Sequence, residues 1–393
     1  MPFAAALSEH PDARVAVAET AGAVLDRLGT GVDVVWAFLT AAHAPVAAEV
    51  AEVVHRTLAP RALVATTAVA VVGGARGVEN GPGLSLFAGR LATPARPVRL
   101  RAARRDDGLA VHGMAELVAD APDGATVLVA TDPFTFPVDA FLTELGRHRP
   151  DLAVVGGLAS GADRAGGNRL VLDRRVHTDG AVGLVLDRDA APRPVVSQGC
   201  RPIGRPWTVT RADRQLLLEL GGRPALERLL STVEELDEMD RALVAGGLHC
   251  GIVVDERRLE FQRGDFLIRG VLGADSAQGA VAVGDVVPVG ATVQFQVRDA
   301  RTAAEDLVTL LQGHAAAARA LGAGEPAGAL VFTCNGRGSF MFGDPHHDAA
   351  IVAETLGDVP AAGMFCAGEL GPIGPRNALH GFTASVAVFR DPA

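Results

Sequence analysis

The chain has 393 residues, of which 49% are hydrophobic and 21% are charged. Such a chain can bury enough apolar surface for two cores, because single domains seldom reach this length. The formal net charge of -10 excludes a broad nucleic-acid surface, which must be positive to neutralise phosphates. No apolar run approaches the ~20 residues of a membrane span, and the N-terminus lacks a basic region before its first apolar stretch. We therefore expect a cytoplasmic protein with no membrane insertion and no nucleic-acid partner.

The first part of the chain alternates helical and strand patterns. Residues 13–28 and 46–58 place apolar side chains at helical spacing. Residues 32–40 and 62–73 are continuous apolar runs, which are typical of buried strands. A glycine-rich turn follows and leads to another strand at 83–91. The opening module is therefore predicted to be strand, helix, strand, glycine loop and strand.

The same order occurs twice more along the chain. The second copy has a strand at 126–131, a helix at 138–147 and a strand at 151–161. The third copy has a strand at 328–335, a helix at 348–356 and strands within 359–375 and 379–389. The shared order predicts a duplicated α/β architecture, in which glycine loops lie at the strand ends that usually bind ligands.

The stretch 195–297 reads differently, because it contains hairpin signals and one helix at 225–235 after Pro224. A helix at 303–320 connects it to the third copy. Charged residues and prolines concentrate at 188–195, which favours a boundary there. We predict an α/β fold of two packed mixed α/β domains, residues 1–190 and 191–393, with duplicated strand-helix-strand units and a β-rich middle segment.

Three ordered segments carry a family resemblance. They are 197–227 (SQGCRPIGRPWTVTRADRQLLLELGGRPALE), 331–343 (VFTCNGRGSFMFG) and 367–375 (AGELGPIGP). Segments 73–89 and 154–172 add a softer match. Over nearly its full length the chain resembles the FIST N and FIST C domain pair. This resemblance implies a sensory domain of signal transduction that binds small molecules such as amino acids. No kinase, methyl-acceptor or cyclic-dinucleotide output follows, so the resemblance leaves the signalling partner unnamed.

The most informative loop is CNGRGS, which contains Cys334, Asn335, Gly336, Arg337 and Gly338 and follows a predicted strand. Glycines on both sides of the arginine would let backbone N–H groups approach an anion while the guanidinium pairs with a carboxylate. An amino-acid ligand needs such a clamp. The alternative is a tight structural turn in which the arginine pairs with an acid of the fold. A Walker phosphate loop is excluded, because its lysine and hydroxyl are missing.

Two other loops offer charged groups to the same kind of ligand. Glu369, beside Gly368, would accept a ligand ammonium or hold Arg337 in position, or it would brace a buried loop. The glycine spacing around it is not a dinucleotide fingerprint, because a strand follows where a helix is required. Arg201, in a loop stiffened by Pro202, is a second anion contact or a brace between the domains. Glu369 and Arg201 are therefore candidate ligand-binding residues.

The N-terminal half contributes Ser160 and Asn168 as hydrogen-bonding candidates, although loop structure explains both equally well. Ser160 does not have the GxSxG spacing of a hydrolase nucleophile. Cys334 as a nucleophile lacks a base that the sequence can identify. Catalytic residues are therefore not assigned, and an enzyme that uses Cys334 or Ser160 is an alternative.

No metal is assigned. His346, His347 and Asp348 are the densest group of metal-ligating residue types, but adjacent histidines seldom face one centre and Asp348 suits a helix N-cap. The four cysteines are isolated, so we expect reduced thiols, with Cys250 and Cys366 as small core residues. The sequence requires no cofactor. A haem-binding gas sensor stays open, because branches of the resembled family have been linked to haem.

The residues together predict a sensory protein that binds an amino acid or a similar small anion and signals through a partner protein. The pocket is expected between the two domains, lined by the glycine loops at the strand ends. The predicted ligand-binding residues are Arg337, Glu369, Arg201, Asn335, Cys334, Gly336, Gly338, Gly368, Ser160 and Asn168.

Overall fold

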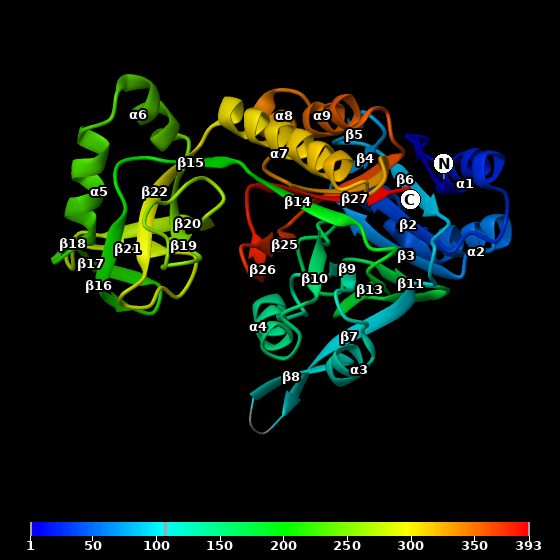
Figure 1. Cartoon of the computed structure of the whole chain (residues 1–393), viewed down its shortest axis with the longest axis horizontal. Helices are drawn as coiled ribbons and strands as arrows, with labels where there is room; N and C mark the ends of the chain where they lie inside the picture. Colours follow the sequence, from blue (N-terminus) through cyan, green and yellow to red (C-terminus); the bar gives the residue numbers. More distant parts are fainter. Residues whose placement is uncertain (1, 106–107, 392–393) are drawn as a thin grey trace. The chain divides into compact units, whose positions relative to one another are not determined.

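The computed structural model describes residues 2–105 and 108–391. They divide into two compact units. Figure 1 colours the chain by sequence, from blue at the N-terminus to red at the C-terminus. Unit 1 comprises residues 1–196, 307–379 and 383–393, and unit 2 comprises residues 197–306 and 380–382. The chain therefore leaves unit 1, builds unit 2 and returns.

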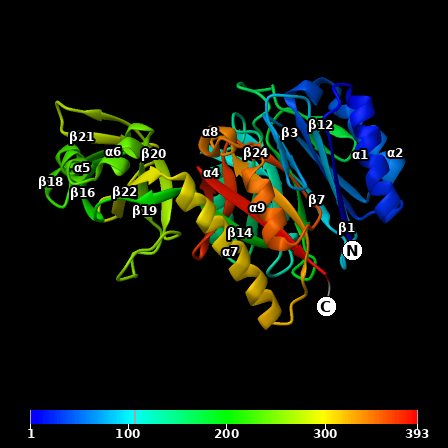
Figure 2. The ribbon, with the colours of Figure 1, turned by 90° about the horizontal axis from the view of Figure 1, so that it is seen from above.

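The first sheet of unit 1 is built from the N-terminal segment. Its strands, in spatial order, are β1 (Phe3–Ser8), β6 (Leu84–Gly89), β2 (Val34–Thr40), β3 (Ala62–Ala68), β11 (Leu170–Leu172) and β12 (Arg175–His177). Helices α1 (Ala13–Leu28) and α2 (Ala47–Leu58) lie side by side on its outer face (Figures 1 and 2). Helix α1 begins at Ala13 because the Asp12 carboxylate accepts the Arg14 amide at 2.8 Å. Helix α2, preceded by the 3₁₀ turn η1 (Ala41–Val46), connects the parallel strands β2 and β3.

The second sheet repeats this arrangement. Its strands are β26 (Arg376–His380), β25 (Glu369–Ile373), β10 (Ala153–Leu158), β9 (Thr126–Thr131), β13 (Ala181–Leu186), β7 (Arg96–Arg105) and β8 (Gly108–His112). Helix α4 (Val138–His148) connects the parallel pair β9 and β10, and it packs with α3 (Met114–Asp120) on the outer face. The apolar sides of these helices bury Phe141 and Leu145 completely.

The third sheet combines the C-terminal segment with two short strands from the N-terminal part. Its strands are β14 (Arg193–Gln198), β27 (Thr383–Arg390), β23 (Pro326–Cys334), β24 (Ala361–Cys366), β4 (Val71–Gly73) and β5 (Arg76–Val78). Strands β23 and β24 are parallel and are connected through α8 (Ser339–Phe342) and α9 (His347–Leu356). Helix α9 and the part of α7 (Ala300–Ala320) from Leu307 onward cover the outer face.

The inner faces of the three sheets share one core. Trp36 and Phe38 from the first sheet meet Phe332 from the third edge to face, with ring centroids 6.4 and 6.0 Å apart. Leu128 and Val155 of the second sheet belong to the same buried cluster. Three strand-helix-strand layers therefore bury one side against helices and the other against each other.

Unit 2 is a small antiparallel β-barrel. Its strands run in the order β15 (Cys200–Pro202), β22 (Thr292–Arg298), β16 (Trp207–Asp213), β17 (Leu216–Leu220), β21 (Ala280–Val283), β20 (Phe266–Asp275) and β19 (Leu248–Val253), and β19 returns to pair with β22. The short β18 (Arg223–Pro224) leads into α5 (Ala225–Glu234), which precedes α6 (Glu238–Ala245). Closure removes the free edges of the barrel strands. A core forms around Val209, Val293 and Phe295, and a smaller buried cluster contains Phe266 and Ile268.

The predicted α/β class, with repeated strand-helix-strand units and a β-rich middle segment, is confirmed. The predicted helix at 13–28 has the same bounds in the structure. The predicted strand at 62–73 is two strands in different sheets, because the chain turns at the half-exposed Val69. The strand at Phe3–Ser8 was not expected. The boundary near 190 and 191 stays a prediction, since the compact units do not divide the chain at a single point.

Candidate functional site

Ser160 holds three strand ends of unit 1 together. Its hydroxyl accepts the Val69 amide after β3 at 3.0 Å and donates to the carbonyl of Phe365 in β24 at 2.5 Å. Ser160 itself follows the end of β10, the parallel strand of the second sheet. The serine is therefore a connector between sheets, which is the structural alternative that its sequence position left open.

Arg337 belongs to the turn that follows β23, and its side chain is buried, so that the residue is only 1% exposed. Its Nε and Nη2 atoms donate to the two carboxylate oxygens of Asp348 at 2.6 and 2.8 Å, which is a bidentate ion pair. The Asp348 carboxylate also accepts the hydroxyl of Thr333 at 2.5 Å. The sequence suggested that Asp348 is the N-cap of α9, and this prediction is wrong. Asp348 lies in the first turn of the helix, and His346 occupies the cap position.

This pair is held charged by its own geometry. Burial alone would raise the pKa of Asp348, but the charge and hydrogen bonds of Arg337 hold that pKa well below its usual range. Burial likewise opposes the charge of Arg337, and Asp348 nevertheless raises its pKa. The Nη1 atom of Arg337 is buried and has no hydrogen-bond partner within the described ranges. One donor of the guanidinium is therefore left for another group.

Glu369 opens β25 opposite Gly157 of β10 and is completely buried. One carboxyl oxygen, Oε2, accepts the hydroxyl and the amide of Thr383 at 2.8 and 3.2 Å. Burial raises the pKa of this carboxyl to about 8, against the opposing effects of Thr383, Arg337 and Cys334. The other oxygen, Oε1, makes no hydrogen bond of normal geometry to any described residue. Glu369 is therefore a carboxyl that can gain or lose a proton near neutral pH.

Cys334 is near both of these side chains. It ends β23, is partly exposed, and is close enough to Glu369 and Arg337 to influence the pKa of each. Its Sγ atom accepts the Gly336 amide at 3.4 Å. The neighbouring turn is fixed by the Asn335 amide, which donates to the carbonyl of Cys366 at 2.9 Å, whereas the Asn335 side chain is exposed. A thiol, a carboxyl and a guanidinium thus converge at the ends of β23 and β24.

The glycines of these loops permit close approach. Gly338 has φ 64, and a Cβ there would collide with the carboxylate of Glu79, which accepts the Ser339 amide at 3.0 Å. The Gly368 carbonyl accepts the Leu158 amide at 2.9 Å and so couples β10 to the turn before β25. The glycines therefore fix the loop positions.

Asn168 is a buried connector elsewhere in unit 1. Its amide nitrogen donates to Asp132 at 2.9 Å, and its oxygen accepts the hydroxyl of Thr67 at 3.3 Å. Arg201 belongs to unit 2, where its guanidinium bonds Asp299 at 2.7 Å and also pairs with Asp240. Both predicted ligand contacts have their polar atoms engaged within their own unit.

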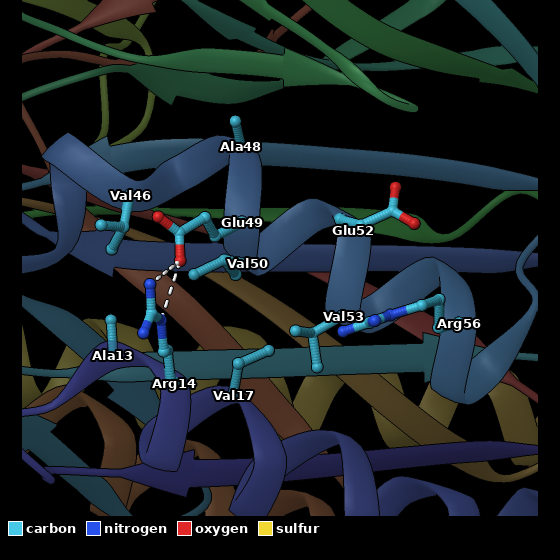
Figure 3. A pocket seen from close by; sticks show the side chains of 10 residues that line it. All are labelled: Ala13, Arg14, Val17, Val46, Ala48, Glu49, Val50, Glu52, Val53 and Arg56. Atoms are coloured by element: carbon cyan, nitrogen blue, oxygen red, sulfur yellow. Dashed lines mark hydrogen bonds and ion pairs between the residues drawn. The ribbon is translucent and has the colours of Figure 1, made fainter.

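A separate groove of about 480 Å³ lies between α1 and α2 (Figure 3). Its floor is apolar, formed by Val17, Val50 and Val53, and the ion pair of Arg14 with Glu49 at 2.8 Å borders it. None of the ligand-binding residues predicted from the sequence line it. The groove is therefore separate from the cluster around Arg337, Cys334 and Glu369.

Haem requires a histidine or cysteine that faces an apolar cavity of sufficient size. A cavity of about 900 Å³ in unit 1 is lined by His148 and Met114. The His148 side chain is 56% exposed and bonds Glu144 at 3.0 Å along the outer surface of α4. These residues do not form a closed axial-ligand site, so we assign no haem to this cavity.

Two features of the site were not predicted. Asp348, the partner of Arg337, could not be found because the two residues are 11 positions apart with a turn between them. The contact of Cys334 with Glu369 depends on the pairing of β10 with β25, which no local pattern indicates. The only available signal was the polar residue type at each strand end.

In the described part of the chain, no three or more His, Cys, Asp or Glu side chains are grouped so that they could hold a metal ion. None of its described helices has the length and apolar character of a membrane span.

Comparison with known proteins places the whole chain in one family. The FIST N domain model matches residues 33–223, and the FIST C domain model matches residues 225–372. The uncharacterized protein Mb0898c of Mycobacterium bovis is 46% identical over 383 residues, which cover 97% of each chain. The uncharacterized protein MT0656 of Mycobacterium tuberculosis is 42% identical over 392 residues, which cover the full length of both chains. FIST domains are sensory modules of signal transduction, and this chain belongs to the FIST family.

Proposed function

We propose that this protein is a cytoplasmic sensor that binds an amino acid or a similar small anion at the strand ends around Arg337, Cys334 and Glu369. The observation that carries the proposal is a pair of buried polar atoms, Arg337 Nη1 and Glu369 Oε1, for which no hydrogen-bond partner of normal geometry lies among residues 2–105 and 108–391. Buried polar groups are nearly always hydrogen-bonded, because leaving one unpaired costs roughly 1–3 kcal/mol. A ligand that pairs with both atoms would remove that cost.

The charges suit a ligand with a carboxylate and an ammonium group. Asp348 already occupies Nε and Nη2 of Arg337, so Nη1 would donate one charge-assisted hydrogen bond to the ligand carboxylate. Glu369, whose pKa is raised to about 8, would release its proton when a ligand ammonium arrives and pair with it. Asn335, exposed at the same turn, would contribute its side-chain amide.

Binding would become a signal through the elements that carry the site. Ser160 connects the third sheet to the ends of β10 and β3, and the Gly368 carbonyl binds the Leu158 amide at the end of β10. A ligand that favours one arrangement of these strand ends would shift the population of unit 1 towards it, and a partner protein would recognise that state. Arg201, in unit 2, stays a predicted ligand contact.

The test is a thermal-shift screen of the 20 amino acids, acetate, succinate and haem against the purified chain, because a ligand of the native state raises its stability. We expect a concentration-dependent rise in Tm with one class of carboxylate. The rise should be lost in Glu369→Gln, which keeps the acceptor for Thr383 but removes the charge.

Two matched variants locate the ligand. Arg14→Gln changes the rim of the groove between α1 and α2, and the Tm shift should persist in it. Arg201→Gln tests the contribution of unit 2. A shift that is lost only in Arg14→Gln, or that is unchanged in Glu369→Gln, would contradict the proposed site. A shift with haem alone would favour the gas-sensor alternative.

A further inference from the structure

Two of the four cysteines stand opposite each other at the ends of neighbouring strands. Cys334 ends β23, Cys366 ends β24, and the two are register partners in a parallel pair. Each follows by two positions a residue of the shared core, Phe332 and Met364 respectively, so both thiols are on the same face of the sheet. Partners in adjacent strands lie about 5 Å apart. That separation falls within the Cα range of a disulfide, roughly 4.4 to 6.8 Å.

The two thiols differ in access. Cys334 is partly exposed, whereas Cys366 is completely buried in the shared core. The Sγ atom of Cys366 occupies space that exists because residue 157 is glycine, since a Cβ there would collide with it. Burial, reinforced by Glu369 and Cys334, raises the pKa of Cys366 well above its ordinary value. A small oxidant from solvent would therefore meet Cys334 first.

The surroundings of Cys334 can hold a thiolate and supply a proton. The Gly336 amide donates to its Sγ at 3.4 Å, and the buried Arg337 guanidinium lies nearby, its Nη1 without a hydrogen-bond partner in the described part of the chain. The Glu369 carboxyl is close to the same thiol. Cationic and N–H neighbours stabilise a thiolate, which is the reactive form of cysteine. Burial raises the pKa of Glu369 to about 8, so this carboxyl is an acid beside Cys334 at neutral pH.

We propose that Cys334 and Cys366 form a dithiol pair that hydroperoxides oxidise to an intramolecular disulfide. The Cys334 thiolate attacks one peroxide oxygen and the O–O bond breaks, which leaves a sulfenic acid. Glu369 donates its proton to the leaving oxygen, which departs as water or an alcohol, and Glu369 then takes up the proton that the Cys334 thiol released. Cys366 then attacks the sulfenic sulfur, so the S–S bond forms, the S–O bond breaks and its proton leaves with the hydroxyl as water. Two thiols and one hydroperoxide give a disulfide, one alcohol or water, and one water.

This inference does not depend on ligand binding, since it needs only the two thiols and Glu369. A disulfide at the ends of β23 and β24 would fix the turn that carries Asn335 and Arg337. The cysteines of unit 2, Cys200 and Cys250, are both buried and provide internal controls.

The test treats the reduced full chain with hydrogen peroxide in a Cys200→Ser/Cys250→Ser background and measures intact mass under denaturing, thiol-blocking conditions. We expect the loss of two hydrogen atoms, reversed by dithiothreitol, and one internal disulfide by peptide mapping. Cys334→Ser should abolish the oxidation. Cys366→Ser should instead yield a dimedone adduct on Cys334, and Cys366→Ala repeats this test if serine at the buried site disturbs folding. Glu369→Gln should slow the reaction at least tenfold.

Three results would overturn the proposal: no mass change with peroxide, sulfinic acid on Cys334 beside an intact Cys366 thiol, or a disulfide that joins two chains on a non-reducing gel. Equal oxidation rates in Glu369→Gln and its parent would remove the carboxyl from the mechanism. Trp36 fluorescence in a Trp207→Phe background reports the core of unit 1 and verifies that each variant is folded.

Discussion

Two arginines that look alike in the sequence, each flanked by a glycine or proline loop, have different surroundings in the structure. Arg337 in unit 1 is 1% exposed, has one carboxylate partner and keeps one donor without a partner among the described residues. The side chain of Arg201 in unit 2 is 22% exposed and bonds two carboxylates, Asp240 and Asp299. All three of its guanidinium nitrogens make hydrogen bonds. Residue type and loop context therefore do not separate a site with spare hydrogen-bonding capacity from a satisfied brace, but burial and partners do.

The largest expected loss of stability comes from removing Asp348, the carboxylate partner of Arg337. Asp348→Ala leaves an unpaired charge in the core, so we expect the free energy of unfolding of unit 1 to fall by about 3–5 kcal/mol. Urea titration in a Trp207→Phe background measures this, because the chain's two tryptophans lie in different units and only Trp36 then reports. A loss below about 1 kcal/mol would show that Arg337 is hydrated or paired elsewhere.

The carboxyl of Glu369 should make the stability of unit 1 depend on pH. Its pKa is about 8 in the folded chain and 4.5 ordinarily, so the folded state holds a proton that the unfolded state has released between these values. The stabilisation is fully present below pH 4.5 and is lost as the pH rises through 8. We expect the free energy of unfolding to fall by up to about 1.4 kcal/mol per pH unit in this window. Glu369→Gln should abolish that slope in urea titrations at pH 5.5, 6.5 and 7.5, and an unchanged slope would exclude Glu369 as its source.

The packing of Cys366 against Gly157 provides a smaller effect. Gly157→Ala would force its Cβ against the Cys366 sulfur, so we expect a loss of about 1–3 kcal/mol in the stability of unit 1. Cys366→Ala should recover part of that loss in the double variant, because the colliding sulfur is removed. Additive losses in the double-mutant cycle would mean that the two residues do not share this space.

The smallest effect is expected at the second arginine. Arg201→Gln removes a partly exposed charge from two carboxylates, so we expect a loss of roughly 1–2 kcal/mol in unit 2 alone. Trp207, which lies between the guanidinium groups of Arg205 and Arg228, reports this unit in a Trp36→Phe background. If Arg201→Gln lowered the free energy of unfolding as much as Asp348→Ala does, burial would not distinguish the two arginines.

The spacing of apolar residues in the sequence was sufficient to predict much of the fold, but it predicted little of the candidate site. Helix α1 was predicted with its observed bounds, because the apolar spacing along it is a local signal. The switch of the chain from β3 to β4 was not predicted, because it depends on a hydrogen bond from Val69 to Ser160, 91 residues away. The polar residues at the strand ends were identified from the sequence, but their partners were not. Their pairing follows from which strands are neighbours, and no local pattern encodes that.

The most direct test of the proposed ligand site is the alkylation rate of Cys334 by iodoacetamide, with and without the amino acid or organic acid that gives the largest thermal shift. Peptide mass spectrometry follows Cys334 separately from the buried Cys366. We predict that alkylation slows in proportion to ligand occupancy and that Glu369→Gln loses this protection at the same ligand concentration. An unchanged Cys334 alkylation rate at saturating ligand would place the ligand elsewhere and contradict the proposed site.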